Sequence, residues 1–155
     1  MMMQMQPLGV KGTVELVARN ADGEVIARRM IENLITNVGL AFLAGDPTGD
    51  TDMTTMKYIA IGTGVAAAAA ADTTLGTEIE TRAVGVQTRV TTTVANDTYQ
   101  AVGTVSITGT HAVTECGLLS ANAVGTLGAR QVFAALNLVN GDTLELTWKW
   151  KFANA

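Results

Sequence analysis

The chain of 155 residues is 48% hydrophobic but only 15% charged, so Thr, Asn, Gln and Ser fill its polar faces in place of ion pairs. The formal net charge is −4 and the ten Lys and Arg residues form no basic patch, which argues against nucleic acid as a partner. A single Cys excludes an intrachain disulfide framework, and no apolar run is long enough to span a membrane.

The chain begins with a Met-rich segment, residues 1–9, which we expect to form a flexible arm. It lacks the basic and apolar regions of a signal peptide, so we expect a protein made and assembled in a reducing cytoplasm. The arm is either a disordered tail or a segment that orders on a neighbouring subunit. In the second case its contact residues are Met1, Met2, Met3, Met5, Pro7 and Leu8. Residues 10–155 then form a single domain.

A hairpin and a short helix are predicted next. Residues 10–19 alternate apolar and polar side chains, and residues 24–30 return after an Asn-Ala-Asp-Gly turn. Over residues 33–44 the pattern changes to that of a short helix, capped by Thr36 or Asn37 and stopped by Gly45. The polar loop 46–55 lacks the terminal bidentate Glu of a calcium-binding loop, so we expect a plain loop there.

The middle of the chain is rich in small residues. Residues 56–61 predict a strand that ends at Gly62-Thr63-Gly64, and a lone Gly-x-Gly is no phosphate cradle. Residues 65–71 include six consecutive Ala and predict a loop or a single turn lying against an apolar surface. Glu78 and Arg82 are four apart, so a short turn would pair them.

A long strand is predicted over residues 83–94, with its valines on one face, and residues 98–107 return after Asn96-Asp97 to form another hairpin. The clearest alternation lies in residues 140–152. There the expected dry face consists of Leu144, Leu146, Trp148, Trp150 and Phe152. Asn140-Gly141 favours a type I′ turn that folds this strand back on residues 131–139. We expect this C-terminal hairpin to anchor the core, with Leu146, Trp148, Trp150 and Phe133 among its buried residues.

Together these segments indicate a mainly β fold. At least seven short strands with turn-rich connections favour an antiparallel β-sandwich or jelly roll with one short helix and a flexible N-terminal arm. A barrel is the alternative.

The sequence contains no convincing catalytic set. His111 and Cys116 are the sole residues of their types, and a dyad between positions five apart would need a sharp bend. One Cys and one His provide no zinc spacing. The acidic pairs Glu78/Glu80 and Asp46/Asp50 could serve a glycosidase, but aromatic platforms for sugar rings are scarce at 5% aromatic residues. We therefore expect no enzyme, no cofactor and no metal.

Several short motifs occur in a recognisable order. They are Asn33-Leu34-Ile35-Thr36-Asn37-Val38-Gly39-Leu40, Lys57-Tyr58-Ile59-Ala60-Ile61-Gly62-Thr63-Gly64, Thr73-Thr74-Leu75-Gly76-Thr77-Glu78 with Arg82, Val113-Thr114-Glu115-Cys116-Gly117-Leu118-Leu119, Ala129-Arg130-Gln131-Val132-Phe133 and Gly141-Asp142-Thr143-Leu144. This series, which covers most of residues 12–152, resembles small virion structural proteins of tailed bacteriophages, described as head decoration (cement) or tail-fibre-like proteins. Cys116 departs from the small residue expected before Gly117 but preserves its size.

The resemblance implies a β-sandwich that binds other virion subunits. The first hypothesis is a decoration protein on the outer capsid surface, a dimer or trimer that clamps major capsid protein subunits through the arm and loops 46–55 and 65–71. The second is a tail-fibre or tail-tip protein that binds other tail subunits or a host surface glycan. A hydrolase that uses Glu115 or His111 on a jelly-roll scaffold is the third, and the missing catalytic set speaks against it.

Overall fold

The computed structural model describes residues 8–154, and within them the chain is mainly antiparallel β with nine strands and one α-helix. The strands are β1 Leu8–Arg19, β2 Val25–Ile35, β3 Tyr58–Gly62, β4 Glu78–Val84, β5 Val86–Val90, β6 Thr98–Ser106, β7 His111–Leu119, β8 Leu127–Leu138 and β9 Thr143–Asn154. Helix α1, Asn37–Gly45, follows β2 and leads into two 3₁₀ turns, Asp46–Thr48 and Met53–Thr55. The mainly β prediction is confirmed.

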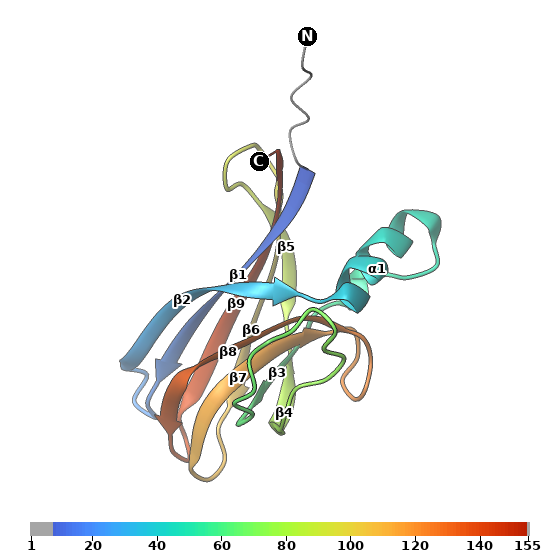
Figure 1. The fold of residues 1–155 in the computed structure, drawn as a ribbon. Coiled ribbons are helices and arrows are strands. Elements are labelled where there is room, and N and C mark those ends of the chain that lie inside the picture. The colour runs from blue at the N-terminus through green and yellow to red at the C-terminus, as the bar shows by residue number, and fades with distance from the viewer. Residues whose placement is uncertain (1–7, 155) are drawn as a thin grey trace.

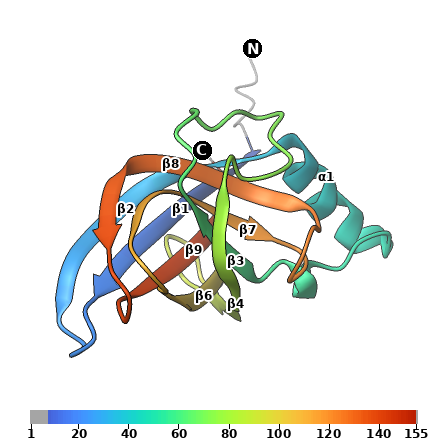
Figure 2. The same cartoon turned by 90° about the horizontal axis from the view of Figure 1, so that it is seen from below.

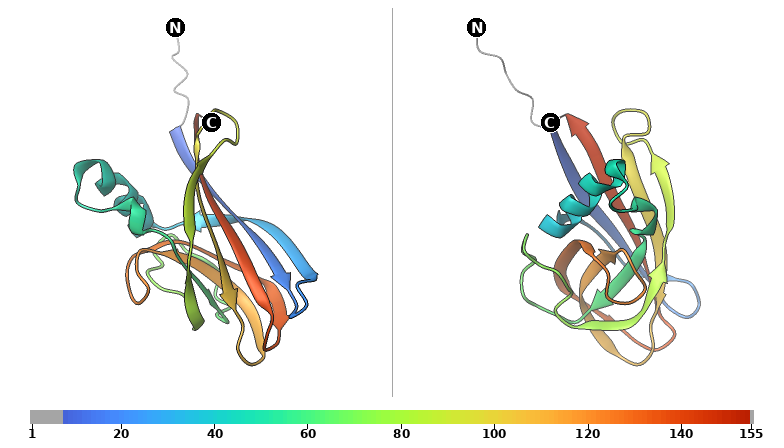
Figure 3. Two further views of the ribbon diagram at one scale, coloured as in Figure 1. Left: turned by 180° about the vertical axis from the view of Figure 1, so that it is seen from behind. Right: turned by 90° about the vertical axis from the view of Figure 1, so that its right-hand side faces the viewer.

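Hydrogen bonds join the strands into a single sheet in the order β4-β3-β7-β8-β2-β1-β9-β6-β5. The sheet curls around one core until its two ends come together, so that it is barrel-like and nearly closed (Figures 1 and 3). The two end strands, β4 and β5, are separated by Gly85 alone. The N–H of Gly85 donates to the carbonyl of Lys57 at 2.7 Å, which ties this junction to the residue before β3.

The expected dry face of the C-terminal strand is confirmed over most of its length. Leu144, Leu146, Trp148 and Trp150 are fully buried in β9, whereas Phe152 is 41% exposed and was wrongly placed in the core. The neighbouring strands complement the two large rings, because Gly12 lies beside Trp150 and Ala101 lies beside Trp148. Each buried ring contributes roughly 1.5–3 kcal/mol through the hydrophobic effect. Phe133 packs against this core but is only half-buried.

The prediction of a C-terminal hairpin is wrong. β9 pairs with β1 and β6, and β8 pairs with β7 and β2, so these two successive strands lie in different parts of the sheet. A type I′ turn needs positive φ at both central residues, but of the pair Asn140-Gly141 only Gly141 has it, at 93°. The turn therefore sends the chain across to the other side of the core.

The first hairpin and the presence of a short helix are confirmed, but residues 33–35 belong to β2, and the helix includes Gly45 in place of stopping before it. β1 and β2 pair antiparallel from Gly12 to Arg19. Thr36 is the N-cap of α1, and its side chain accepts the N–H of Gly39 at 3.0 Å. β1 begins at Leu8, which pairs with Asn154, so Leu8 and Gly9 belong to the sheet and not to the arm. Residues 1–7, the rest of the expected arm, lie outside the described residues.

The expected long strand of residues 83–94 is divided differently. β4 already starts at Glu78, the chain bends at Gly85, and β5 ends at Val90. The predicted hairpin with residues 98–107 is confirmed, because β5 pairs antiparallel with β6. Val84 and Val86 flank the bend and are 62% and 68% exposed, so this valine face points to solvent.

Candidate functional site

A buried ion pair between Glu115 on β7 and Arg130 on β8 is the most enclosed charged group among the described residues. Glu115 is fully buried and Arg130 is 3% exposed. Nε and Nη2 of Arg130 donate to Oε2 of Glu115 at 3.0 and 2.8 Å. Arg130 lies opposite Gly117, and Glu115 and Gly117 are two apart on β7, so both charged side chains are on the outer face of the sheet. The pair is buried there because a loop covers it.

That loop consists of residues 63–77, which join β3 to β4 and lie over β7 and β8 (Figure 2). Arg130 holds the middle of the loop, since Nη1 donates to Oδ2 of Asp72 at 2.8 Å and Nη2 donates to the carbonyl of Ala66 at 3.0 Å. Glu115 holds both ends, because its carboxylate accepts three backbone N–H groups, from Gly64 at 2.9 Å, Gly76 at 2.9 Å and Thr77 at 2.7 Å.

These contacts keep the site ionised. Burial raises the pKa of Glu115, but hydrogen bonds from the N–H groups of Thr77 and Gly76 and from Arg130 outweigh it, so the pKa lies below its ordinary value. Burial also opposes the charge of Arg130, yet Glu115 and Asp72 raise its pKa overall. The Glu115 carboxylate accepts five hydrogen bonds, and the loop covers it. It therefore stabilises the loop, and a substrate has no access to it.

Four of the motifs that carry the phage resemblance meet at this ion pair. They contribute Gly64, Gly76 and Thr77, Glu115, and Arg130. Glu115 and Arg130 stand in two separate sequence motifs, and Glu115 was considered only as a residue of a hydrolase, so the sequence did not predict that the two pair. One feature of the sequence could have predicted the pair. Glu115 is an acidic residue inside an apolar strand, and a carboxylate buried in such a strand needs a partner of opposite charge.

The alanine segment was expected to lie against an apolar surface, and that expectation is wrong for most of it. Residues 65–71 are exposed apart from the half-buried Ala68, and the carbonyls of Ala66 and Ala67 turn toward Arg130. The apolar contact of the loop comes later, from Leu75, which packs over Gly117 and joins a small cluster with Ala60, Leu119 and Leu127.

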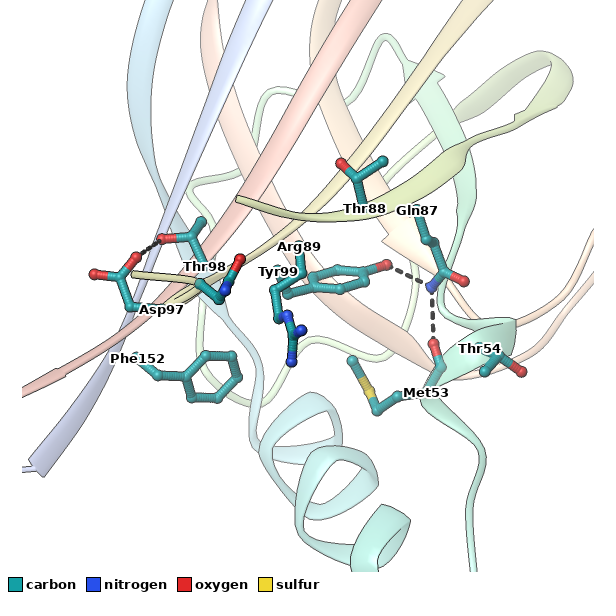
Figure 4. A pocket seen from close by; sticks show the side chains of 10 residues that line it. Met53, Thr54, Gln87, Thr88, Arg89, Asp97, Thr98, Tyr99 and Phe152 are labelled. Atoms are coloured by element: carbon teal, nitrogen blue, oxygen red, sulfur yellow. Dashed lines mark hydrogen bonds between the residues drawn. The ribbon is translucent and has the colours of Figure 1, made fainter. Parts of the chain in front are cut away.

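A second feature is an open hollow of about 380 Å³ at the end of the sheet near α1. Figure 4 shows Phe152, Tyr99 and Met53 around it, from β9, β6 and the second 3₁₀ turn. Gln87 fixes one wall, because its Nε2 donates to the Tyr99 hydroxyl and to the Met53 carbonyl, both at 2.8 Å. Burial raises the pKa of Tyr99 to about 12, so its ring presents a neutral surface.

The charged residues of this hollow are Arg89 and Asp97. Asp97 is held by the turn between β5 and β6, since its carboxylate accepts the N–H groups of Thr92, Thr93 and Val94 and the hydroxyl of Thr98. These hydrogen bonds, the one from Val94 foremost, outweigh the effect of burial and lower the pKa of Asp97. The lining residues therefore offer apolar contact area and the cation of Arg89, with no free carboxylate beside it.

The structure keeps His111 and Cys116 apart. Five residues of extended strand separate the two by roughly 16 Å. Cys116 lies in the buried core, where burial raises the pKa of its thiol. His111 lies at the start of β7, and its Nε2 is 3.2 Å from Oε1 of Glu80 and 2.9 Å from the carbonyl of Thr108. A Cys–His dyad is excluded by this geometry.

The paired acids have separate partners. Glu78 and Arg82 do pair, at 2.6 Å between Oε1 and Nε, but within the irregular strand β4, where Glu80 has a φ of 60°, and not within a helical turn. Glu80 instead accepts the N–H and hydroxyl of Thr108. Among the described residues no cluster of three or more His, Cys, Asp and Glu is arranged to hold a metal ion.

The expected contact residues are only partly placed. Loop 46–55 contributes Met53 and Thr54 to the hollow. Met1, Met2, Met3, Met5 and Pro7 lie outside the described residues, and Leu8 starts β1. No helix in the described part of the chain has the length and apolarity needed to cross a bilayer. Comparison with protein-family models, curated proteins and solved structures finds no significant match.

Proposed function

We propose that this protein is a non-enzymatic structural component of a tailed-bacteriophage virion. Its role is that of a decoration (cement) protein, which binds the outer capsid surface and stabilises contacts between major capsid protein subunits. It is assembled in the cytoplasm of the bacterial host as a dimer or trimer, without a cofactor, nucleic acid or membrane partner. The ordered series of sequence motifs and the low charge of the chain support this proposal.

In this proposal the sheet serves as a sandwich or jelly-roll type of scaffold. Strands β2, β1, β9, β6 and β5 form one layer, and β4, β3, β7 and β8 form the other. β2 and the bend at Gly85 join the two layers. A scaffold of this kind presents loops at its ends, and loop 63–77, fixed by Glu115 and Arg130, is a rigid loop available for contact.

The observation that carries the proposal is the apolar hollow around Met53, Tyr99 and Phe152. Phe152 is 41% exposed there, and a large exposed ring beside a hollow is typical of a surface that a partner covers. Each apolar side chain that a capsid subunit buries in it contributes roughly 1.5–3 kcal/mol. Many copies on one shell add avidity.

The test is binding to shells of the phage that carries this gene. We expect the unmodified protein to be present in hundreds of copies per particle, and F152E to lose occupancy because it places a charge in the hollow. V139E, at an exposed turn residue away from the hollow, is the matched control and keeps full occupancy. Absence of the protein from purified particles would overturn the proposal.

The alternative is a tail-fibre or tail-tip protein that binds other tail subunits or a host surface glycan. The same apolar hollow serves this role, with Tyr99 and Phe152 as rings that could stack on a sugar. Copy number separates the two functions, because a handful of copies per particle would assign the protein to the tail.

A further inference from the structure

Two strands of the sheet leave their facing edges largely unpaired. β2 and β8 are neighbours, yet they pair only at Leu34 with Arg130 and at Ile35 with Ala129. Residues 25–33 of β2 pair with β1 alone, and residues 131–138 of β8 pair with β7 alone. In Figure 1 the two strands meet close to α1 and separate toward the turn between β1 and β2. We call this opening the β2–β8 gap.

Backbone groups of β2 point into the β2–β8 gap. The carbonyl of Glu32 accepts the side-chain amide of Gln131 from β8, so Glu32 faces the gap. N–H and C=O groups of a strand alternate in direction, so those of Arg28 and Met30 face the gap as well. Across the gap Arg29 donates a hydrogen bond to the carbonyl of Ala134. Two side chains therefore occupy positions where a strand would supply backbone partners.

The core is incomplete on the same side. The inward row of β1, with Val14, Leu16 and Ala18, is fully buried, whereas the inward row of β2, with Ala27, Arg29 and Ile31, is only half-buried. Both rows belong to the same layer, so the difference comes from the missing neighbour of β2. The gap thus offers unpaired backbone groups beside a half-buried row in which two apolar side chains flank Arg29, and an added strand would supply both backbone partners and apolar cover.

We infer that the β2–β8 gap binds residues 1–7 of a second copy as an additional strand. In an extended segment Met1, Met3 and Met5 share one face, and Met2, Gln4 and Gln6 share the other. The Met face covers Ala27, Ile31 and Phe133, and the Gln residues face solvent. Pro7 has no N–H to donate, so it separates this strand from β1.

The length of the segment favours a second copy over the chain's own N-terminus. Seven extended residues span roughly 23 Å, which suits the nine-residue stretch of β2 that has no strand partner on the side of the gap. Gly12 of β1 pairs with Asn33, which lies at the closed end of the gap. β1 extends four residues past this point to Leu8, so the chain's own N-terminal segment begins outside the gap. To reach its own gap, the segment would first have to run back along these four residues, which uses about 13 Å of its length. The remainder would reach only the first few residues of the gap.

This inference rests on the proposed function for its role on a capsid, but its experiment uses the free protein. The full chain, a chain lacking residues 1–7 and two double variants are compared by sedimentation and by amide hydrogen exchange over a range of concentrations. M3E/M5E charges the inward face of the added strand, and Q4E/Q6E places the same charge on the outward face. We expect the full chain and Q4E/Q6E to self-associate and to protect the amides of Arg28 and Met30 from exchange.

The shortened chain and M3E/M5E should lose both the self-association and the protection. A monomeric full chain, an oligomer that persists without residues 1–7, or equal loss in the two double variants would overturn the inference. Protection that is independent of concentration would assign the gap to the chain's own segment and would also overturn it. If strand exchange occurs but capsids do not bind the protein, the proposed function fails and this inference stands.

Discussion

At the scale of single residues, Glu115 and Arg130 determine how a long loop is held. A buried carboxylate is unfavourable unless donors surround it, and here five N–H groups do so at 2.7–3.0 Å. The residues next to this carboxylate must be small, because a Cβ on Gly64 would lie only 2.6 Å from Oε1 of Glu115. The pair therefore fixes both the shape of the loop and the residues that can stand next to it.

Replacing this carboxylate should be costly. E115Q keeps the shape of the side chain but turns one acceptor into a donor and leaves Arg130 with Asp72 as its sole acidic partner. We expect a loss of about 3 kcal/mol in the free energy of unfolding, measured by urea denaturation. The control is E15Q, since the exposed pair of Glu15 with Arg28 should contribute less than about 0.5 kcal/mol. Equal losses in the two variants would show that the buried pair has no special role.

The same carboxylate makes stability depend on pH. The pKa of Glu115 is lower in the folded protein than its ordinary value of 4.5, so the folded state favours the ionised form. Its contribution is therefore present above about pH 4.5 and is lost as pH falls through the lower folded pKa. We expect the urea midpoint to decrease from pH 5 toward pH 3 more steeply for the unmodified protein than for E115Q. Parallel curves for the two proteins would contradict this assignment.

At the scale of elements, β4 and β5 act as one strand bent at Gly85 that belongs to both ends of the sheet. β4 pairs with β3 and β5 pairs with β6, so the bend joins the two ends. Gly103 of β6 lies close against this junction, because a Cβ added to it would be 3.3 Å from the Cα of Gly85. The absence of side chains at both glycines lets the backbones approach.

A side chain at the bend should loosen this junction. A Cβ on residue 85 would lie 2.9 Å from the carbonyl oxygen of Lys57 and 3.3 Å from Cδ1 of Ile59. We expect G85A to lower the free energy of unfolding by about 1–3 kcal/mol and to speed amide exchange in β3 and β4. G9A is the control, because no atom lies within 4 Å of its added Cβ. Unchanged exchange in β3 and β4 would mean that the junction tolerates a side chain.

At the scale of the whole molecule, the sequence determined the features that depend on neighbours along the chain. The alternation in β9, the cap of α1 at Thr36 and the first hairpin follow from side-chain period and turn chemistry, which are local. The tertiary structure decided which strands pair. It placed β9 between β1 and β6, bent the chain at Gly85 and brought Glu115 to Arg130 across a strand pair. Except in hairpins such as β1–β2, strand pairing and ion pairing join residues that are distant in sequence, and local patterns do not identify the partner.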